Sequence, residues 1–366
     1  MNKIYLSGNY VIVEKDGNVY EYPRTLSVYT LENSNYVIKE RIDDGQFVIP
    51  ISQIGTYFDE AGAVAYDEAS LVAFLRTNTG FKTAGGGSPA TEFIMLIKTD
   101  NSGTTASNQF AIPTAGTGYN YDVDWGDGTT STGLTAGTTH TFPSVGNYVV
   151  KISGDFPRIY FSNGGDKLKL LEVQNWGNIV WGSDFRNAFF GCSNMNITAT
   201  DSPDLSNTTL MTAFLYNCTS LNADLGSWDV SNCTGMAAMF QGATIYQGQG
   251  LENWDVSNVT NMSSMFFLTN FDNNIGNWQL NSGLTTMDSI FRSGSLPSSA
   301  NYTDSIVGWA NYVFTNGAPF SVNMGQQFGK TFDTSRSGGA NFADAGAART
   351  YLTTTAGWTI SSDTVI

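Results

Sequence analysis

Two stretches of the chain are close copies of each other: Trp228-Asp-Val-Ser-Asn-Cys-Thr-Gly-Met-Ala-Ala-Met-Phe240 and Trp254-Asp-Val-Ser-Asn-Val-Thr-Asn-Met-Ser-Ser-Met-Phe266. Weaker copies end at Phe189, Phe214 and Phe291, so these phenylalanines recur every 25 or 26 residues. A period near 25 with apolar residues at fixed offsets is typical of a leucine-rich-repeat-like solenoid. We expect each turn of the solenoid to contain one short strand and one short helical or 3₁₀ segment.

The repeat predicts which side chains are buried. A side chain on the inner face of a stack returns to that face once per turn. We therefore expect six recurring side chains to be buried: Trp228, Met239, Phe240, Trp254, Met265 and Phe266. The last turn would expose its apolar face without a cap. Helices at Tyr302–Phe314 and Asp344–Leu352, followed by Gly357–Ile360, are expected to form that cap.

The motif Trp-Asp-Val-Ser-Asn-Val-Thr-x-Met-x-x-Met-Phe resembles the BspA-type leucine-rich repeats of bacterial surface proteins, which also occur in phages that infect Bacteroidetes. The resemblance covers about residues 165–295, and the end of the chain resembles the C-terminal cap of such arrays. It implies a repeat domain at residues 158–300 and a cap at residues 301–366, displayed on the surface of a cell or particle.

A second motif precedes the repeats. Val-Asp-Trp-Gly-Asp-Gly-Thr at Val123–Thr129 is followed by His-Thr-Phe and by Gly-x-Tyr-x-Val within His140–Val150. The pair resembles the PKD-type immunoglobulin-like β-sandwich, which we place at residues 90–157. The resemblance implies that Trp125 and Tyr148 are core residues and that Asp127 is a turn residue.

The first 82 residues read as a small α+β anchoring module. Apolar runs flank the turn signal Lys15–Asn18, which predicts a hairpin, and Asn33–Asn35 predicts another. A helix is expected at Glu68–Thr77, with Asp67 as its N-cap and a buried face of Leu71, Val72, Phe74 and Leu75. Residues 83–89 are a Gly-rich linker. The predicted fold is multidomain and mainly β.

Charge excludes two classes of partner. The chain has 32 Asp and Glu against 17 Lys and Arg, which gives a net charge of −15. No Lys or Arg occurs from Asn187 to Ile290, whereas eight Asp or Glu do. A protein that binds nucleic acid or an anionic membrane needs a basic surface, so we expect neither as a partner. No apolar segment near the N-terminus or elsewhere is long enough to predict a signal peptide or a membrane span.

Few residues could carry chemistry. His140 is the only histidine, which excludes a multi-histidine metal site, and we expect it to be structural. The three cysteines fit neither a disulfide framework nor a zinc spacing. Cys192 and Cys218 lie at nearly equivalent repeat positions, where a buried stack is favoured and a disulfide between neighbouring turns stays open.

Acidic residues offer two further candidate sites. Asp122, Asp124 and Asp127 could hold calcium, although turn and surface roles are favoured because no further acidic ligand follows nearby. Asp229 and Asp255 recur after the repeat tryptophans, as capping residues would. No catalytic pair and no phosphate-binding loop stands out. We expect no enzyme activity, no cofactor and no metal. No residue can be assigned to ligand binding from the sequence alone.

Three functions compete. The first is a non-enzymatic structural or adhesive protein of a phage virion surface. Its N-terminal module would dock on capsid or tail proteins, and its repeats would face outward to a host glycan or protein. The second is a bacterial cell-surface adhesin, and the third a hydrolase with a repeat-built binding arm. We favour the first; head or tail location, ligand and self-association stay open.

Overall fold

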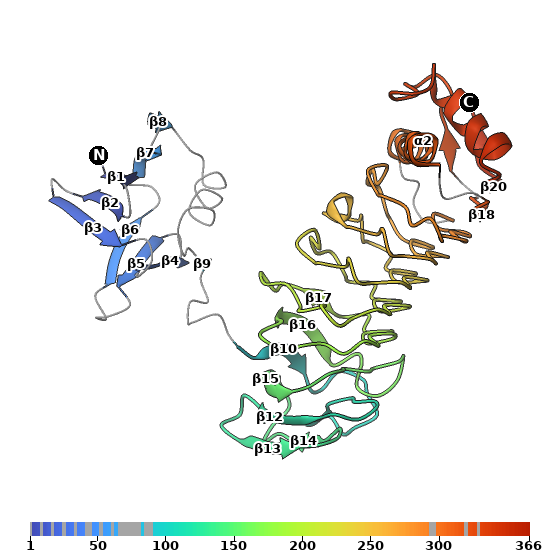
Figure 1. Cartoon of the computed structure of the whole chain (residues 1–366). Coiled ribbons are helices and arrows are strands. Elements are labelled where there is room, and N and C mark those ends of the chain that lie inside the picture. The colour runs from blue at the N-terminus through green and yellow to red at the C-terminus, as the bar shows by residue number, and fades with distance from the viewer. Residues whose placement is uncertain are drawn as a thin grey trace. The chain divides into compact units, whose positions relative to one another are not determined.

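The computed structural model of the chain divides into two compact units, Met1–Pro89 and Ala90–Ile366. Figure 1 shows the elements of both. In the first unit the structure describes nine strands; in the second it describes residues 91–292, 298–317, 321–327 and 330–366. Among these residues, no helix is both apolar and long enough to cross a membrane.

The described part of the first unit consists of two small sheets, with strand orders β3-β2-β1-β7-β8 and β6-β5-β4-β9. Both predicted hairpins are present: β2 pairs with β3 up to Lys15 and Asn18, and β4 pairs with β5 up to Glu32 and Asn35. The predicted helix Glu68–Thr77 and linker residues 84–89 lie outside the described residues. The strands are β1 (Asn2–Ser7), β2 (Tyr10–Lys15), β3 (Asn18–Pro23), β4 (Ser27–Glu32), β5 (Asn35–Glu40), β6 (Gln46–Pro50), β7 (Ile54–Asp59), β8 (Gly62–Val64) and β9 (Lys82–Thr83).

The second unit begins with a six-stranded sheet in the order β13-β12-β15-β10-β16-β17. Its inner face alternates as buried strands require, with Phe93, Met95 and Ile97 fully buried on the central strand. A separate strand pair covers part of this core. The strands are β10 (Phe93–Lys98), β12 (Asn120–Asp124), β13 (Thr130–Leu134), β15 (Asn147–Asp155), β16 (Leu170–Asn175), β17 (Asn196–Ile197), and the pair β11 (Gln109–Ala111) and β14 (Thr139–Thr141).

The sheet and the repeats share one core. β10 pairs with β15 on one side and with β16 on the other, so the sheet runs across the boundary expected between residues 157 and 158. A buried ion pair reinforces the junction. Asp166 accepts hydrogen bonds from the backbone of Thr104, Thr105 and Ala111, and Lys169 donates to the carbonyls of Ala106 and Gln109. Residues 90–157 therefore pack as the first layer of the repeat stack.

The repeats form a stack of turns (Figure 1), and a parallel hydrogen-bond ladder joins each turn to the next. In each turn, alternate amides donate to carbonyls of the next turn: Ala238 N to Ser263 O at 2.8 Å, and Phe240 N to Met265 O at 3.0 Å. Single parallel bridges mark the successive rungs, from Asp184 through Leu210, Gly235, Asn261 and Thr286 to Asn323. The turns are thus held together by the backbone as well as by their cores.

The ladder is not built from ordinary strands. Two positions per turn have left-handed backbone: Asn187, Ala213, Ala238, Ser264 and Ser289 at one, and Gly191, Asn217, Gly242 and Leu268 at the other. Tight turns close around them, as from Phe214 N to Met211 O at 3.2 Å. The expectation of a strand and a helical segment in every turn is therefore wrong. From residue 176 to residue 292, which the structure describes throughout, the sole helical segment is the 3₁₀ turn η2 (Leu251–Asn253).

The predicted core is confirmed, with one change of register. All six recurring side chains are at most 5% exposed: Trp228, Met239, Phe240, Trp254, Met265 and Phe266. The residue equivalent to Phe240 in the preceding turn is Leu215, not Phe214. Leu215 N donates to Met239 O as Phe240 N donates to Met265 O. Phe214 is itself buried, which is why both positions look alike in the sequence.

The cap imitates one more turn. Trp309 of α2 (Ser299–Asn316) donates from Nε1 to Ile275 O, as Trp278 does to Leu251 O. Its ring stacks on Phe291 at 6.1 Å. β18 (Asn323–Gln326) accepts from the last rung, where Met287 N lies 2.7 Å from Asn323 O. Both predicted helices are present; the remaining elements are β19 (Thr331–Phe332), α3 (Ala345–Thr350), the π-helical turn η3 (Tyr351–Thr355), β20 (Thr359–Ser361) and β21 (Thr364–Val365).

Candidate recognition surfaces

An exposed row of carboxylates runs along the repeats. We call Asp204, Asp229 and Asp255 the aspartate row, because each occupies the same place in its turn. Each Oδ1 accepts the amide two residues later, at 2.9–3.1 Å. The capping role expected for Asp229 and Asp255 is therefore met by Asx turns, which fix the direction of each side chain.

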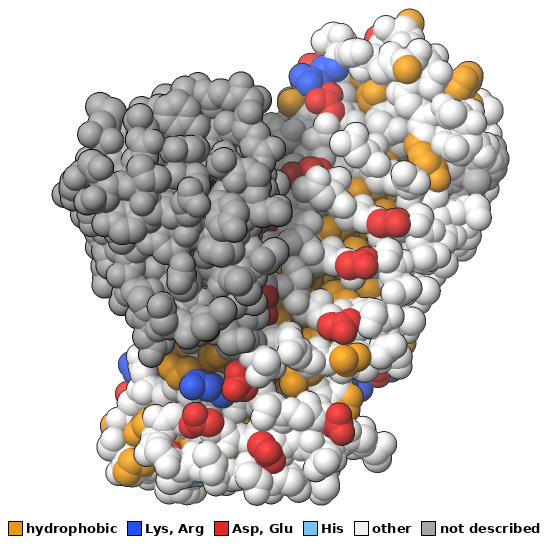
Figure 2. Space-filling model, turned by 60° about the vertical axis from the view of Figure 1, so that its left-hand side comes forward, with side chains coloured by type: hydrophobic (Ala, Val, Ile, Leu, Met, Phe, Trp, Pro, Cys, Tyr) orange, Lys and Arg blue, Asp and Glu red, His pale blue; other side chains and the backbone are white. Residues whose placement is uncertain are grey.

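The aspartate row carries negative charge at neutral pH. Hydrogen bonds from the side chain and backbone of Ser206 lower the pKa of Asp204, and those from Ser231 lower the pKa of Asp229. Figure 2 shows acidic side chains recurring along the repeat stack with no basic side chain between them. Because these carboxylates are turned outward and ionised, they favour ligands that donate hydrogen bonds and repel anions.

Other polar side chains of this face hold the stack together. Asn232 donates from Nδ2 to Ser206 O at 3.0 Å, and Asn258 to Ser231 O at 2.7 Å. A parallel series of threonines links each turn to its predecessor, as in Thr234 Oγ1 to Thr209 O at 3.2 Å. These Asn and Thr side chains are therefore structural, whereas the carboxylates of the aspartate row accept hydrogen bonds from their own turn and are candidates for recognition.

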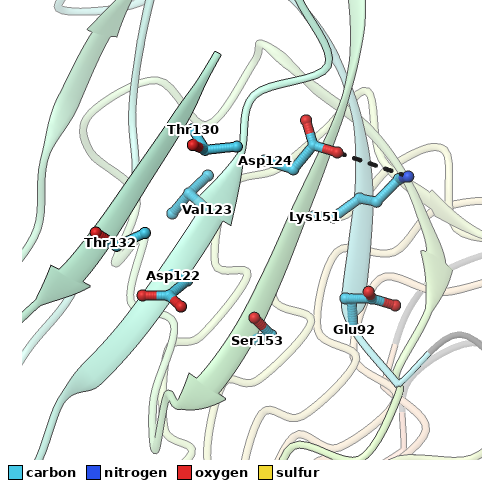
Figure 3. A pocket seen from close by; sticks show the side chains of 8 residues that line it. All are labelled: Glu92, Asp122, Val123, Asp124, Thr130, Thr132, Lys151 and Ser153. Carbon is cyan, nitrogen blue, oxygen red and sulfur yellow. Dashed lines mark ion pairs between the residues drawn. The ribbon is translucent and has the colours of Figure 1, made fainter. Parts of the chain in front are cut away.

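A second polar surface lies on the outer face of the six-stranded sheet (Figure 3). There a groove of about 260 Å³, which we call the sheet groove, opens between side chains of β12, β13 and β15 and of the residue before β10. Its lining combines carboxylates, hydroxyls and one ammonium group: Glu92, Asp122, Val123, Asp124, Thr130, Thr132, Lys151 and Ser153.

The three acidic residues considered for calcium do not form one site. Asp122 and Asp124 share the outer face, as strand alternation predicts, and both line the sheet groove. Asp127 instead turns into the protein, where its side chain is 3% exposed and its Oδ2 lies 2.8 Å from His140 Nε2. Within the described residues, no three His, Cys, Asp or Glu side chains are arranged to hold a metal ion.

His140 belongs to a packed cluster. Its ring stacks on Trp125 at 4.5 Å and meets Phe142 edge-on at 4.6 Å. Desolvation raises the pKa of Asp127, but hydrogen bonds from Thr129 and His140 outweigh it and leave that pKa below its usual value. The contact between His140 and Asp127 therefore stabilises the turn that joins β12 and β13 at the end of the sheet.

The two predicted core aromatics of this region differ in burial. Trp125 is buried as expected. Tyr148 is only half-buried: its ring stacks on Phe142 at 4.1 Å, while its hydroxyl donates to Ser144 O at the surface. An amphipathic tyrosine can pack its ring and still keep its hydroxyl in water.

The cysteines are free thiols inside the stack. Cys192, Cys218 and Cys233 are fully buried and unpaired with one another. Burial raises the pKa of all three thiols, that of Cys233 to about 12, and Cys218 Sγ donates to Phe189 O. Of the two alternatives for Cys192 and Cys218, a buried stack or a disulfide between neighbouring turns, the structure shows the buried stack. Neutral buried thiols are poor nucleophiles.

A half-buried aromatic series escaped the sequence analysis. Phe190 stacks on Tyr216 at 4.5 Å, Gln241 donates to the Tyr216 hydroxyl, and the Arg292 guanidinium lies over the Phe267 ring at 5.7 Å. Each residue directly follows an inner Phe or Leu of the ladder. That spacing was the available signal, but polar residues (Gln241 and Arg292) occupy two of the five positions, which hides the series.

Comparison with known proteins bears on the repeats. Residues 183–309 match a family described as "Mycoplasma protein of unknown function, DUF285". The match falls within the repeats and the start of the cap, covers less than half of the chain, and is compatible with a surface protein of the BspA type. No curated protein and no solved structure matches the chain. The repeat region of this mainly β chain is thus similar to the DUF285 family.

Proposed function

We propose that this protein is a non-enzymatic structural and adhesive protein of a phage virion surface, either a capsid decoration or a fibre-like component. The N-terminal module docks it on capsid or tail proteins. The segment resembling a PKD domain forms the base of the repeat stack, and the repeats face outward to a glycan or protein of the host.

The aspartate row is the observation that carries the recognition part of this proposal. Asx turns hold three exposed carboxylates in register on successive rungs, so their geometry exists before any ligand arrives. Preorganised groups lose little entropy on binding. The thiols, by contrast, are buried, and His140 is engaged with Asp127, so the residues best suited to catalysis are occupied in packing.

A bacterial cell-surface adhesin is the second candidate. The family match of residues 183–309 favours it, because that match is compatible with a BspA-type surface protein. Both candidates use the repeats in the same way and differ in what the first unit is attached to.

Two measurements on the full chain test the proposal. Labelled protein should bind host cells at physiological salt, and substitution of all three residues of the aspartate row by Asn should weaken that binding at least tenfold. Immunogold labelling should then decorate phage particles. Labelling of uninfected bacterial envelopes instead would favour the adhesin, and turnover of any glycan would overturn the non-enzymatic assignment.

A further inference from the structure

The sheet groove holds polar groups that the fold does not use. Among the described residues, the Glu92 carboxylate has no hydrogen-bond or ion-pair partner, and neither do the hydroxyls of Thr130, Thr132 and Ser153. Figure 3 shows these side chains around the groove. Thr130 and Thr132 lie on β13, Ser153 lies on β15, and Glu92 directly precedes β10. The pairing of β12 with β13 and β15, and of β10 with β15, fixes the spacing of these residues.

The remaining charges of the groove are only partly committed. Asp122 Oδ1 accepts a hydrogen bond from the amide of Gly133 at 2.8 Å. Asp124 Oδ1 accepts a hydrogen bond from the amide of Gly126, and Asp124 Oδ2 lies 3.7 Å from Lys151 Nζ. Such an exposed ion pair is weak, so a ligand can displace it at little cost. The groove therefore presents free acceptors and free donors together.

This mixture selects the class of ligand. Three carboxylates against one ammonium group repel anionic ligands. The carboxylates do not converge as metal ligands within the described residues, and no aromatic side chain lines the groove for an apolar ligand. A hydroxyl group both donates and accepts, so a hydroxyl-rich ligand can satisfy Glu92 and Asp122 as a donor and Lys151 as an acceptor.

We propose that the sheet groove binds a short segment of a neutral, hydroxyl-rich glycan, as a site distinct from the aspartate row. This rests on the proposed function in that it names the class of host ligand and a place for it. Hydrogen bonds to charged groups are the stronger ones, so Glu92 and Lys151 contribute most to binding.

The test uses the full chain and defined probes. Neutral manno-, gluco-, galacto- and N-acetylglucosamine oligosaccharides are arrayed beside uronic and sulfated oligosaccharides, and dissociation constants follow from calorimetry. We expect binding to neutral probes alone. The double variant Glu92→Gln with Lys151→Met should weaken it at least tenfold, a loss of about 1.4 kcal/mol. The matched control Asp155→Asn, on the same sheet face outside the groove, should change it less than twofold.

The outcomes separate this site from the function as a whole. Absence of binding to every neutral probe, or equal binding by the double variant and the wild type, overturns the groove as a glycan site. Loss of probe binding in the double variant, with host-cell binding kept through the aspartate row, supports two independent sites. Failure of the wild type to bind cells refutes the proposed function separately. Unchanged thermal unfolding of the variants establishes that they are folded.

Discussion

At the scale of single residues, the left-handed positions of the ladder matter most. Ala213, Ala238, Ser264 and Ser289 adopt positive φ without being glycine, at a cost of about 1–2 kcal/mol each. The surrounding hydrogen bonds to the next turn hold them there. Alanine and serine give no sequence signal for this conformation, so the expectation of regular strands and helical segments failed at these positions.

We predict that Ala238→Val destabilises the protein by about 2 kcal/mol or more, because a β-branched residue is strongly disfavoured at positive φ. The neighbouring substitution Ala237→Val is the matched control. Ala237 is equally half-buried and has ordinary φ, so its change should stay within about 0.5 kcal/mol. Chemical denaturation of both variants measures the difference, and equal losses would contradict the role of the left-handed backbone.

The aspartate row predicts acid sensitivity. The pKa values of Asp204 and Asp229 are lowered in the folded state, so the unfolded chain binds protons more readily. The stability they contribute is complete above the unfolded value of about 3.9 and is lost as pH falls through the folded-state pKa. Melting temperatures from pH 7 to pH 2 should drop most below pH 4.

Two variants separate the charge of Asp229 from its turn. Asp229→Asn keeps an acceptor for the Ser231 amide and cannot titrate, so its melting temperature should depend less on pH below 4. Asp229→Ala removes the acceptor and should lower the melting temperature at pH 7 as well. A profile for Asp229→Asn as steep as that of the wild type would exclude this aspartate as a source of the acid sensitivity.

At the scale of elements, helix α2 closes the stack by close contact as well as by Trp309. A methyl group added at Gly308 would lie 2.4 Å from Gly276 O. Gly308→Ala should therefore destabilise the cap by about 1–3 kcal/mol through overpacking, although alanine is the better helix former. Hydrogen exchange of α2 amides measures this.

Gly164→Ala provides the control for that substitution. Its new methyl would meet nothing nearer than 3.6 Å, and its φ is ordinary, so α2 exchange should be unchanged. If α2 amides exchange no faster in Gly308→Ala than in the wild type, the close contact between Gly308 and Gly276 does not limit docking of the cap.

The elements also show how far the sequence predicts this fold. Periodicity located the inner side chains, because the same position returns to the core in every turn, and the cap helices followed from their apolar faces. The register at Phe214 and Leu215 was ambiguous because both are apolar and buried. The sheet groove was not predictable, since its lining comes from separate strands whose pairing the sequence does not reveal, and Asp127 was grouped with Asp122 only by proximity along the chain.

At the scale of the whole second unit, the buried pair of Asp166 and Lys169 joins the sheet to the repeats. Asp166→Ala leaves Lys169 buried without its counter-charge and should cost about 3–5 kcal/mol. Because sheet and stack share one core, calorimetry should show the unfolding transition of residues 90–366 shifting as one. The exposed pair of Lys98 and Asp100 is the control, and Asp100→Ala should cost less than about 1 kcal/mol.

The way the cap receives the last rung has an evolutionary consequence. β18 accepts at Asn323 O the kind of hydrogen bond that every turn accepts from the one before it. Unequal recombination between two copies of the repeat would therefore insert or excise a whole turn while leaving both junctions intact. Array length can drift among lineages without redesign of either end, and each added turn would lengthen the repeat stack by one rung, about 4.8 Å. Selection on such a protein can therefore change the length of the stack without changing the residues of any single turn.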